Sequence, residues 1–173
     1  GVAIVVHGVL HLTDVGLSLQ LAAVVVAAYT AITFASNVVG GLLGDRVNKR
    51  YAMSAFMVLQ SIGILLFAYT SSPSMAFIFA VVFGIGLGGR SPLLHSLRAE
   101  YFGRKSFGTI LGFSSTLLNI GMMAAPPLVG ILADVQGTYQ NAFLILGVIA
   151  LSGAVAALAV HRPSPPGQSF AQR

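Results

Sequence analysis

Positive charge in this chain is confined to alternate gaps between long apolar segments. Lysine and arginine occur at 46–50, at 98–105 and in the C-terminal tail, whereas the gaps around Asp14, Ser72 and Gln136 contain neither. Arg90 is the exception, because it lies inside an apolar segment. Cations retained on one side of a bilayer fix the orientation of a chain. The pattern therefore predicts a multi-pass membrane protein whose basic gaps and C-terminus are cytoplasmic.

The composition supports lipid as the surrounding solvent. Apolar residues make up 56% of the chain and charged residues 8%, which leaves too little polar surface to cover a water-soluble domain of this length. The net charge of +5 could indicate a nucleic-acid partner, but the cations lie in short gaps beside apolar segments. We therefore expect a lipid bilayer, and no nucleic acid, as the partner. The chain has no cysteine, which excludes disulfides and thiolate metal sites, and no cofactor is expected.

The apolar runs predict membrane-spanning helices. A hydrocarbon core of about 30 Å takes about 20 helical residues, and in lipid only helices and closed barrels satisfy their own backbone groups. The predicted spans are residues 20–43, 51–69, 75–97, 107–133 and 141–160. Residues 1–13 are apolar but too short for a span, so we interpret them as the end of a truncated helix. Residues 163–173 are rich in proline and are predicted to form a disordered cytoplasmic tail.

The first basic gap carries the most specific motif. Residues 41–50, Gly-Leu-Leu-Gly-Asp-Arg-Val-Asn-Lys-Arg, join the first two complete spans. They resemble the loop signature of the major facilitator superfamily, G-x-L-(A/G)-D-R-x-G-(R/K)-(R/K). Asn48 replaces the usual glycine, and asparagine also tolerates a left-handed backbone.

This resemblance implies a cytoplasmic gate in which the Asp45 carboxylate latches the inner side shut. Arg98 would hold that carboxylate in place. The alternative is that the loop is a solvated helix cap that only fixes topology. The residues assigned to this gating motif are Gly41, Gly44, Asp45, Arg46, Arg50 and Arg98.

Two further segments indicate which part of such a protein this is. Residues 134–139, preceded by Pro126 and Pro127, resemble the junction between the last two helices of the superfamily. Residues 101–105 resemble the link before the penultimate helix in the monocarboxylate-transporter and oxalate/formate-antiporter branch. The resemblance implies that residues 1–162 form an all-α, six-helix bundle, the C-terminal half of a twelve-helix transporter. Its partner would be an N-terminal half or a second protomer, and its location the bacterial inner membrane.

Arg90 is the leading candidate for substrate binding. An arginine within a membrane helix costs about 2.5 to 3.5 kcal/mol on the mildest insertion scale. A favourable interaction of Arg90 must therefore compensate this cost. Its fork of donors suits a carboxylate, and Pro92 frees the carbonyl of Gly88 nearby. We expect Arg90 to bind an anionic small-molecule substrate. The alternative is a structural arginine that caps freed carbonyls or pairs across the interface between the halves.

Other polar residues in the apolar segments are weaker candidates. His7, His11 and Asp14 share one helical face; a zinc site is conceivable, but the loose geometry of a helix end disfavours it, so no metal is expected. His11 is instead a candidate for substrate or proton handling. Tyr29 and Asn119 belong to polar stripes at four-residue spacing, and they are candidates for the cavity or for interhelical hydrogen bonds.

The pair Pro126 and Pro127 is predicted to bend its helix and to act as a gate hinge, because two prolines remove helix donors.

An enzyme is not expected, because no nucleophile with a base is visible. The Gly84-x-Gly86-x-x-Gly89 match to a dinucleotide fingerprint lies inside a predicted membrane helix, so it is interpreted as close packing. The predicted function is half of a secondary transporter that moves an organic anion, a monocarboxylate or a dicarboxylate, by alternating access. The alternative is a non-transporting membrane assembly protein that dimerises through its glycine-rich helix faces.

Overall fold

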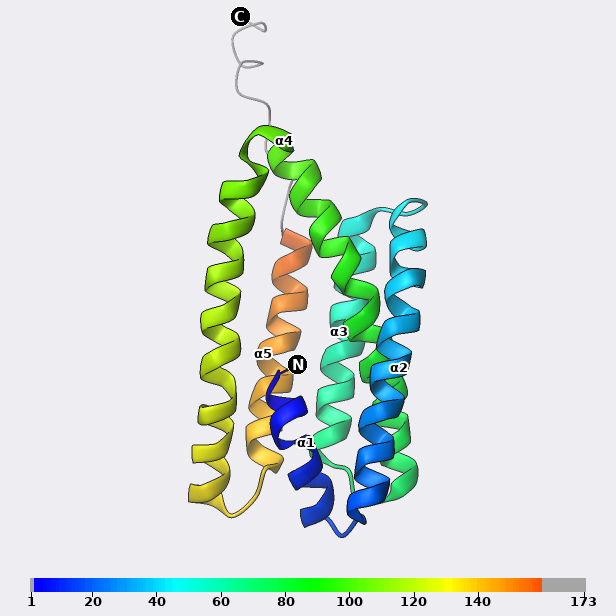
Figure 1. Cartoon of the computed structure of the whole chain (residues 1–173), viewed down its shortest axis with the longest axis vertical. Coiled ribbons are helices and arrows are strands. Elements are labelled where there is room, and N and C mark those ends of the chain that lie inside the picture. The colour runs from blue at the N-terminus through cyan, green and yellow to red at the C-terminus, as the bar shows by residue number, and fades with distance from the viewer. Residues whose placement is uncertain (1, 160–173) are drawn as a thin grey trace, which may run out of the picture.

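The computed structural model describes residues 2–159, apart from the side chains of 102–107 and 110. The regular elements of this part are α-helices (Figure 1). Their bounds are Val2–Asp14 (α1), Leu19–Gly44 (α2), Lys49–Ala68 (α3), Pro73–Gln136 (α4) and Gln140–Ala159 (α5). The bounds of α2, α3 and α5 differ from the predicted spans by at most two residues at either end. The predicted disordered tail, 163–173, lies outside the described residues.

Helix α4 corrects the predicted boundaries. The sequence predicts two helices separated by a basic gap, but α4 is helical from Pro73 to Gln136 and folds back on itself at the end of the molecule (Figure 1). Residues 98–106 contain one glycine and no proline, and their charged and aromatic residues are compatible with a helix. The two membrane-length parts of α4 are Pro73–Tyr101 and Leu111–Gln136, here called the first arm and the second arm.

Local sequence explains where the other helices begin and end. The Ser18 hydroxyl accepts a hydrogen bond from the Leu21 amide and caps α2, and Ser72 caps α4 in the same way through Met75. Asn48 caps α3 by accepting from the Arg50 amide. Its φ of −63° and ψ of 109° are extended and not left-handed, so asparagine serves here as a helix cap.

Glycines let the first arm of α4 lie between α2 and α3. A Cβ on Gly88 would come within 2.2 Å of the Thr33 carbonyl oxygen of α2, and one on Gly86 within 2.3 Å of the Gln60 nitrogen of α3. Gly84 also faces α2, because a Cβ there would lie 2.9 Å from the Tyr29 carbonyl oxygen. These glycines are buried inside the chain, so their faces are not free for a second copy. This finding disfavours the assembly protein that dimerises through glycine-rich faces.

An aromatic cluster joins most of the helices at the end opposite the basic loops. Phe67 of α3 lies 4.3 Å from Phe79 of α4 and 4.9 Å from Phe143 of α5, measured between ring centroids. Phe83 extends the cluster toward Tyr29 of α2. All four phenylalanines are fully buried. The cluster therefore fixes the first arm of α4 against its neighbours.

The described helices have membrane dimensions. Five segments, namely α2, α3, the two arms of α4 and α5, are long and apolar enough to cross a bilayer, while α1 is shorter. The second arm is the least buried of the five; Phe113 is 78% exposed and Met123 77%. The loop at 45–48 and the bend of α4 lie at one end of the bundle, and the loops that follow Asp14 or contain Ser72 and Gly137 lie at the other (Figure 1). The basic segments thus share one end.

Candidate functional site

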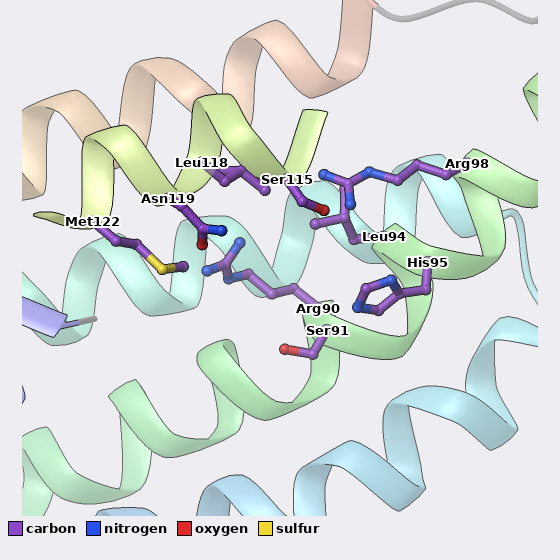
Figure 2. A pocket seen from close by; sticks show the side chains of 9 residues that line it. All are labelled: Arg90, Ser91, Leu94, His95, Arg98, Ser115, Leu118, Asn119 and Met122. Atoms are coloured by element: carbon purple, nitrogen blue, oxygen red, sulfur yellow. The ribbon is translucent and has the colours of Figure 1, made fainter. Parts of the chain in front are cut away.

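A cavity of about 240 Å³ lies between the two arms of α4. The first arm supplies its basic side chains, and the second arm supplies the opposing wall (Figure 2). The lining residues are Arg90, Ser91, Leu94, His95, Arg98, Ser115, Leu118, Asn119 and Met122. None of these described residues is acidic, so the cavity is electropositive.

Arg90 points across the cavity toward Asn119 (Figure 2). Its Nε is buried and has no hydrogen-bond partner among the described residues, and the ion pair found within that part of the chain lies elsewhere. Arg90 is partly exposed as a residue, but a cation whose buried part has no partner is costly unless a counter-charge is supplied. The structural alternative, in which Arg90 caps the carbonyl freed by Pro92, has no hydrogen bond to support it within residues 2–159.

The structure brings together two of the four predicted substrate-binding candidates. Arg90 and Asn119 face each other, but Tyr29 and His11 lie in the aromatic cluster, away from this cavity. Tyr29 is 5% exposed and meets Phe83 edge-on at 5.6 Å. His11 is 3% exposed, and its Nε2 donates a hydrogen bond of 2.9 Å to the Phe67 carbonyl oxygen. Both side chains are therefore held in packing contacts inside the bundle, and their role in binding stays a prediction.

His7 contacts the predicted proline hinge. Its Nε2 lies 3.0 Å from the Pro126 carbonyl oxygen, which links α1 to the second arm of α4. The Nε2 atoms of His7 and His11 thus bond carbonyl oxygens of two different helices, α4 and α3. Asp14 is exposed. Within the described residues no three metal-binding side chains form a group. The second arm remains helical through Pro126 and Pro127, and their role as a hinge stays a prediction.

The gating motif lies where α2, α3 and α4 meet. Gly44 faces the first arm closely, since a Cβ there would come within 2.6 Å of Leu93 Cδ2, whereas one on Gly41 would lie 4.0 Å from Pro92. Asp45 ends α2 and is exposed, as is Arg46. The close approach therefore occurs at Gly44 and not at Gly41.

The charged side chains of this motif are paired differently from the predicted latch. Lys49 forms an ion pair with Glu100. The Arg50 guanidinium lies 5.4 Å from the centre of the Tyr51 ring. Arg98 extends into the cavity beside Arg90 (Figure 2), and no described ion pair joins it to Asp45. In this conformation Arg98 belongs to the cavity, and its role at the gate stays a prediction.

The sequence interpretation assigned two of the nine lining residues, Arg90 and Asn119, to substrate binding. It assigned Arg98 only to the gate, and it did not assign the other six, Ser91, Leu94, His95, Ser115, Leu118 and Met122. The signal was present for the first arm, because Arg90, Leu94 and Arg98 follow at four-residue spacing and must share one helix face. The opposing wall carried a weaker signal, the four-residue spacing of Ser115 and Asn119. That the two faces meet depends on the fold-back of α4.

Comparisons with known proteins agree with this architecture. A family model for the Major Facilitator Superfamily matches residues 2–173. Monocarboxylate transporter 13 of Rattus norvegicus is 28% identical over 150 residues, covering 86% of this chain and 35% of that protein. Monocarboxylate transporter 12 of Rattus norvegicus is 30% identical over 146 residues, covering 82% and 30%. An aspyridones efflux protein of Emericella nidulans is 21% identical over 159 residues, covering 91% and 33%.

The chain spans about a third of the length of these relatives. The three come from a mammal and a fungus, so they lend no support to the expected bacterial membrane. Their names, the matched family model and the membrane-length helices agree with the resemblance carried by residues 41–50. The chain is a multi-pass integral membrane protein that belongs to the major facilitator superfamily, and within it to the branch similar to the monocarboxylate transporters.

Proposed function

We propose that this chain forms the C-terminal half of a secondary transporter that moves a small organic anion, a monocarboxylate or a dicarboxylate, by alternating access. The observation that carries the proposal is the guanidinium of Arg90, which has no partner among the described residues and lies in a cavity whose described lining contains no acid. A guanidinium in a membrane span is expensive. A bound carboxylate would supply the missing counter-charge through two parallel hydrogen bonds. The Asn119 amide opposite Arg90 provides a further donor.

The exposure of the second arm supports a partner that covers it and completes the cavity. The cavity lies between two arms of a single helix, and the second arm leaves most of its apolar side chains exposed. In secondary transporters, substrate sites lie near the bilayer midplane, where two helix repeats meet and rock against each other. An N-terminal six-helix half or a second protomer would cover the exposed arm and close the cavity. Asp45 would then form the cytoplasmic latch with a helix N-terminus of that partner.

The orientation follows from the charged loops. The 45–48 loop and the bend of α4 share one end of the bundle and contain or adjoin most of the cations. Retention of cations on the inner side would place this end in the cytoplasm. The end that contains Asp14, Ser72 and Gly137 would then face outward.

Uptake by the assembled transporter, meaning this chain together with its N-terminal half in proteoliposomes, tests the proposal. Labelled butyrate, lactate and succinate would be compared with a neutral solute of similar size. Arg90→Lys keeps the charge but loses the planar fork, so kcat/KM for the transported acid should fall about tenfold or more. Arg90→Gln should abolish uptake.

Two results would contradict the proposal. Normal acid uptake by Arg90→Lys would exclude bidentate recognition of the substrate. An assembled transporter that moves none of the acids would favour a protein that does not transport organic anions at all. Monodisperse elution of each variant in detergent controls for misfolding.

A further inference from the structure

On each wall of the cavity, a leucine lies between two polar side chains. On the first arm, Arg90, Leu94 and Arg98 lie at four-residue spacing and all line the cavity, so they form one stripe along the helix. Across the cavity, Asn119 and Ser115 of the second arm are one helical turn apart, with Leu118 between them in the lining. The lining also includes Ser91 and His95 of the first arm and Met122 of the second arm. On each wall, a leucine therefore lies between the two polar side chains of the pair, Arg90 and Arg98 or Asn119 and Ser115.

The two arginines are directed at different partners. Arg90 points toward Asn119, whereas the Arg98 side chain extends toward Ser115 (Figure 2). Their Cα atoms are eight residues apart, which corresponds to about 12 Å along a helix. A single carboxylate accepts one guanidinium fork on its two oxygens. One carboxylate bound by Arg90 would therefore leave Arg98 without a counter-charge.

The charges that line the cavity favour a ligand with a second anionic group. Arg90 and Arg98 line the cavity together with His95, and no carboxylate is found among the described lining side chains. Glu100, the nearest acid along the first arm, is already paired with Lys49. Two uncompensated cations repel each other in a medium of low dielectric constant. A ligand with one negative charge would compensate only half of this charge.

We infer that the cavity takes a short aliphatic dicarboxylate, an inference that rests on the proposed function and narrows it. One carboxylate binds Arg90 and Asn119, and the other binds Arg98 and Ser115. The methylene groups between them lie over Leu94 and Leu118. The volume of about 240 Å³ is below the roughly 300–1,000 Å³ typical of pockets for drug-sized ligands, which suits a small molecule.

Matched four-carbon acids test this inference in the assembled transporter. Uptake of labelled succinate and labelled butyrate would be measured at pH 7.5, where carboxylates are ionised, with glutarate as a longer dicarboxylate competitor. The wild-type protein should show a kcat/KM about tenfold or more higher for succinate than for butyrate, because the second carboxylate gains a charge-assisted pair.

Two substitutions separate the two anion positions. Arg98→Gln should lower the ratio of the kcat/KM for succinate to that for butyrate about tenfold, because only succinate reaches this position, whereas a change at the gate would slow both acids alike. Arg90→Gln should lose both acids. Both acids are measured on the same Arg98→Gln preparation, so that folding and gating affect the two rates equally, and Arg98→Lys provides a second variant with its charge retained.

The outcomes distinguish this inference from the function on which it rests. Equal handling of the two acids by the wild-type protein would overturn the dicarboxylate assignment, and so would a parallel loss of both acids in Arg98→Gln. Either result would leave organic anion transport intact. Failure to move any acid would overturn both proposals.

Discussion

Gly40 of α2 lies against the backbone of Gly89 in the first arm of α4. A Cβ on Gly40 would come within 2.3 Å of the Gly89 carbonyl oxygen and 2.6 Å of its Cα. Gly89 precedes Arg90 in the chain, so this contact sets how closely the helix that carries the guanidinium approaches α2. Close backbone approach through small residues is the usual basis of helix packing in membranes, because lipid provides little hydrophobic driving force.

Substitution of Gly40 should loosen this contact. Gly40→Ala places a methyl group inside the van der Waals radius of backbone atoms that cannot move without shifting a helix, and we expect a loss of about 1–3 kcal/mol in the free energy of unfolding. Gly112→Ala is the matched control, because nothing lies within 4 Å of a Cβ there; it should be neutral or stabilise by up to about 1 kcal/mol. Thermal unfolding in detergent measures both. A Gly40→Ala protein as stable as the control would contradict the packing.

The burial and hydrogen bond of His11 predict a contribution to stability, which can be measured separately from its predicted role in substrate binding. His11→Phe keeps a ring in the aromatic cluster but removes the hydrogen bond to the Phe67 carbonyl, so unfolding free energy should fall by about 1 kcal/mol. Thr13→Val, which removes an exposed hydrogen bond to the Leu10 carbonyl, should change stability by less than about 0.5 kcal/mol. Thermal unfolding and the KM for transported acid would be measured together. A raised KM at unchanged stability would instead support the substrate role suggested by the sequence.

The positions of the helices could be predicted because lipid imposes a simple rule. Apolar runs of membrane length have to be helical, and the ends of α2, α3 and α5 follow from these runs. The bend of α4 could not be predicted in the same way. Residues 98–105 contain three cations and were interpreted as a loop, but charge does not prevent a helix at the membrane surface. Only the fold shows that the helix continues through this segment.

The candidate site was predicted in part, for a related reason. Arg90 was found because a cation in an apolar segment is rare and costly. Four-residue spacing identified the faces that carry Tyr29 and Asn119, but spacing does not say which helix each face meets. Tyr29 turned toward Phe79 and Phe83, and the Thr33 hydroxyl donates to the Tyr29 carbonyl within its own helix. Asn119 met Arg90 because α4 folds back.

The orientation of the bundle can be tested by labelling, because the chain has no cysteine of its own. Val47→Cys lies in the loop beside Asp45, and Gln136→Cys lies at the opposite end of the bundle; both positions are exposed. A membrane-impermeant maleimide added to intact cells should label Gln136→Cys and should label Val47→Cys only after permeabilisation, because the basic loops stay inside. Labelling of Val47→Cys in intact cells would reverse the proposed orientation.

The proposed gate makes a prediction about Asp45 that separates transport from binding. Asp45→Asn keeps the size of the side chain at the end of α2 but removes the charge that would meet a helix N-terminus of the partner half. An interaction of this kind is worth about 1 kcal/mol, so uptake by the assembled transporter should slow about fivefold while the affinity for substrate stays unchanged. Asp14→Asn, an exposed aspartate at the other end of the bundle, should not slow uptake. Equal rates for Asp45→Asn and the wild-type protein would show that the loop is only a solvated cap.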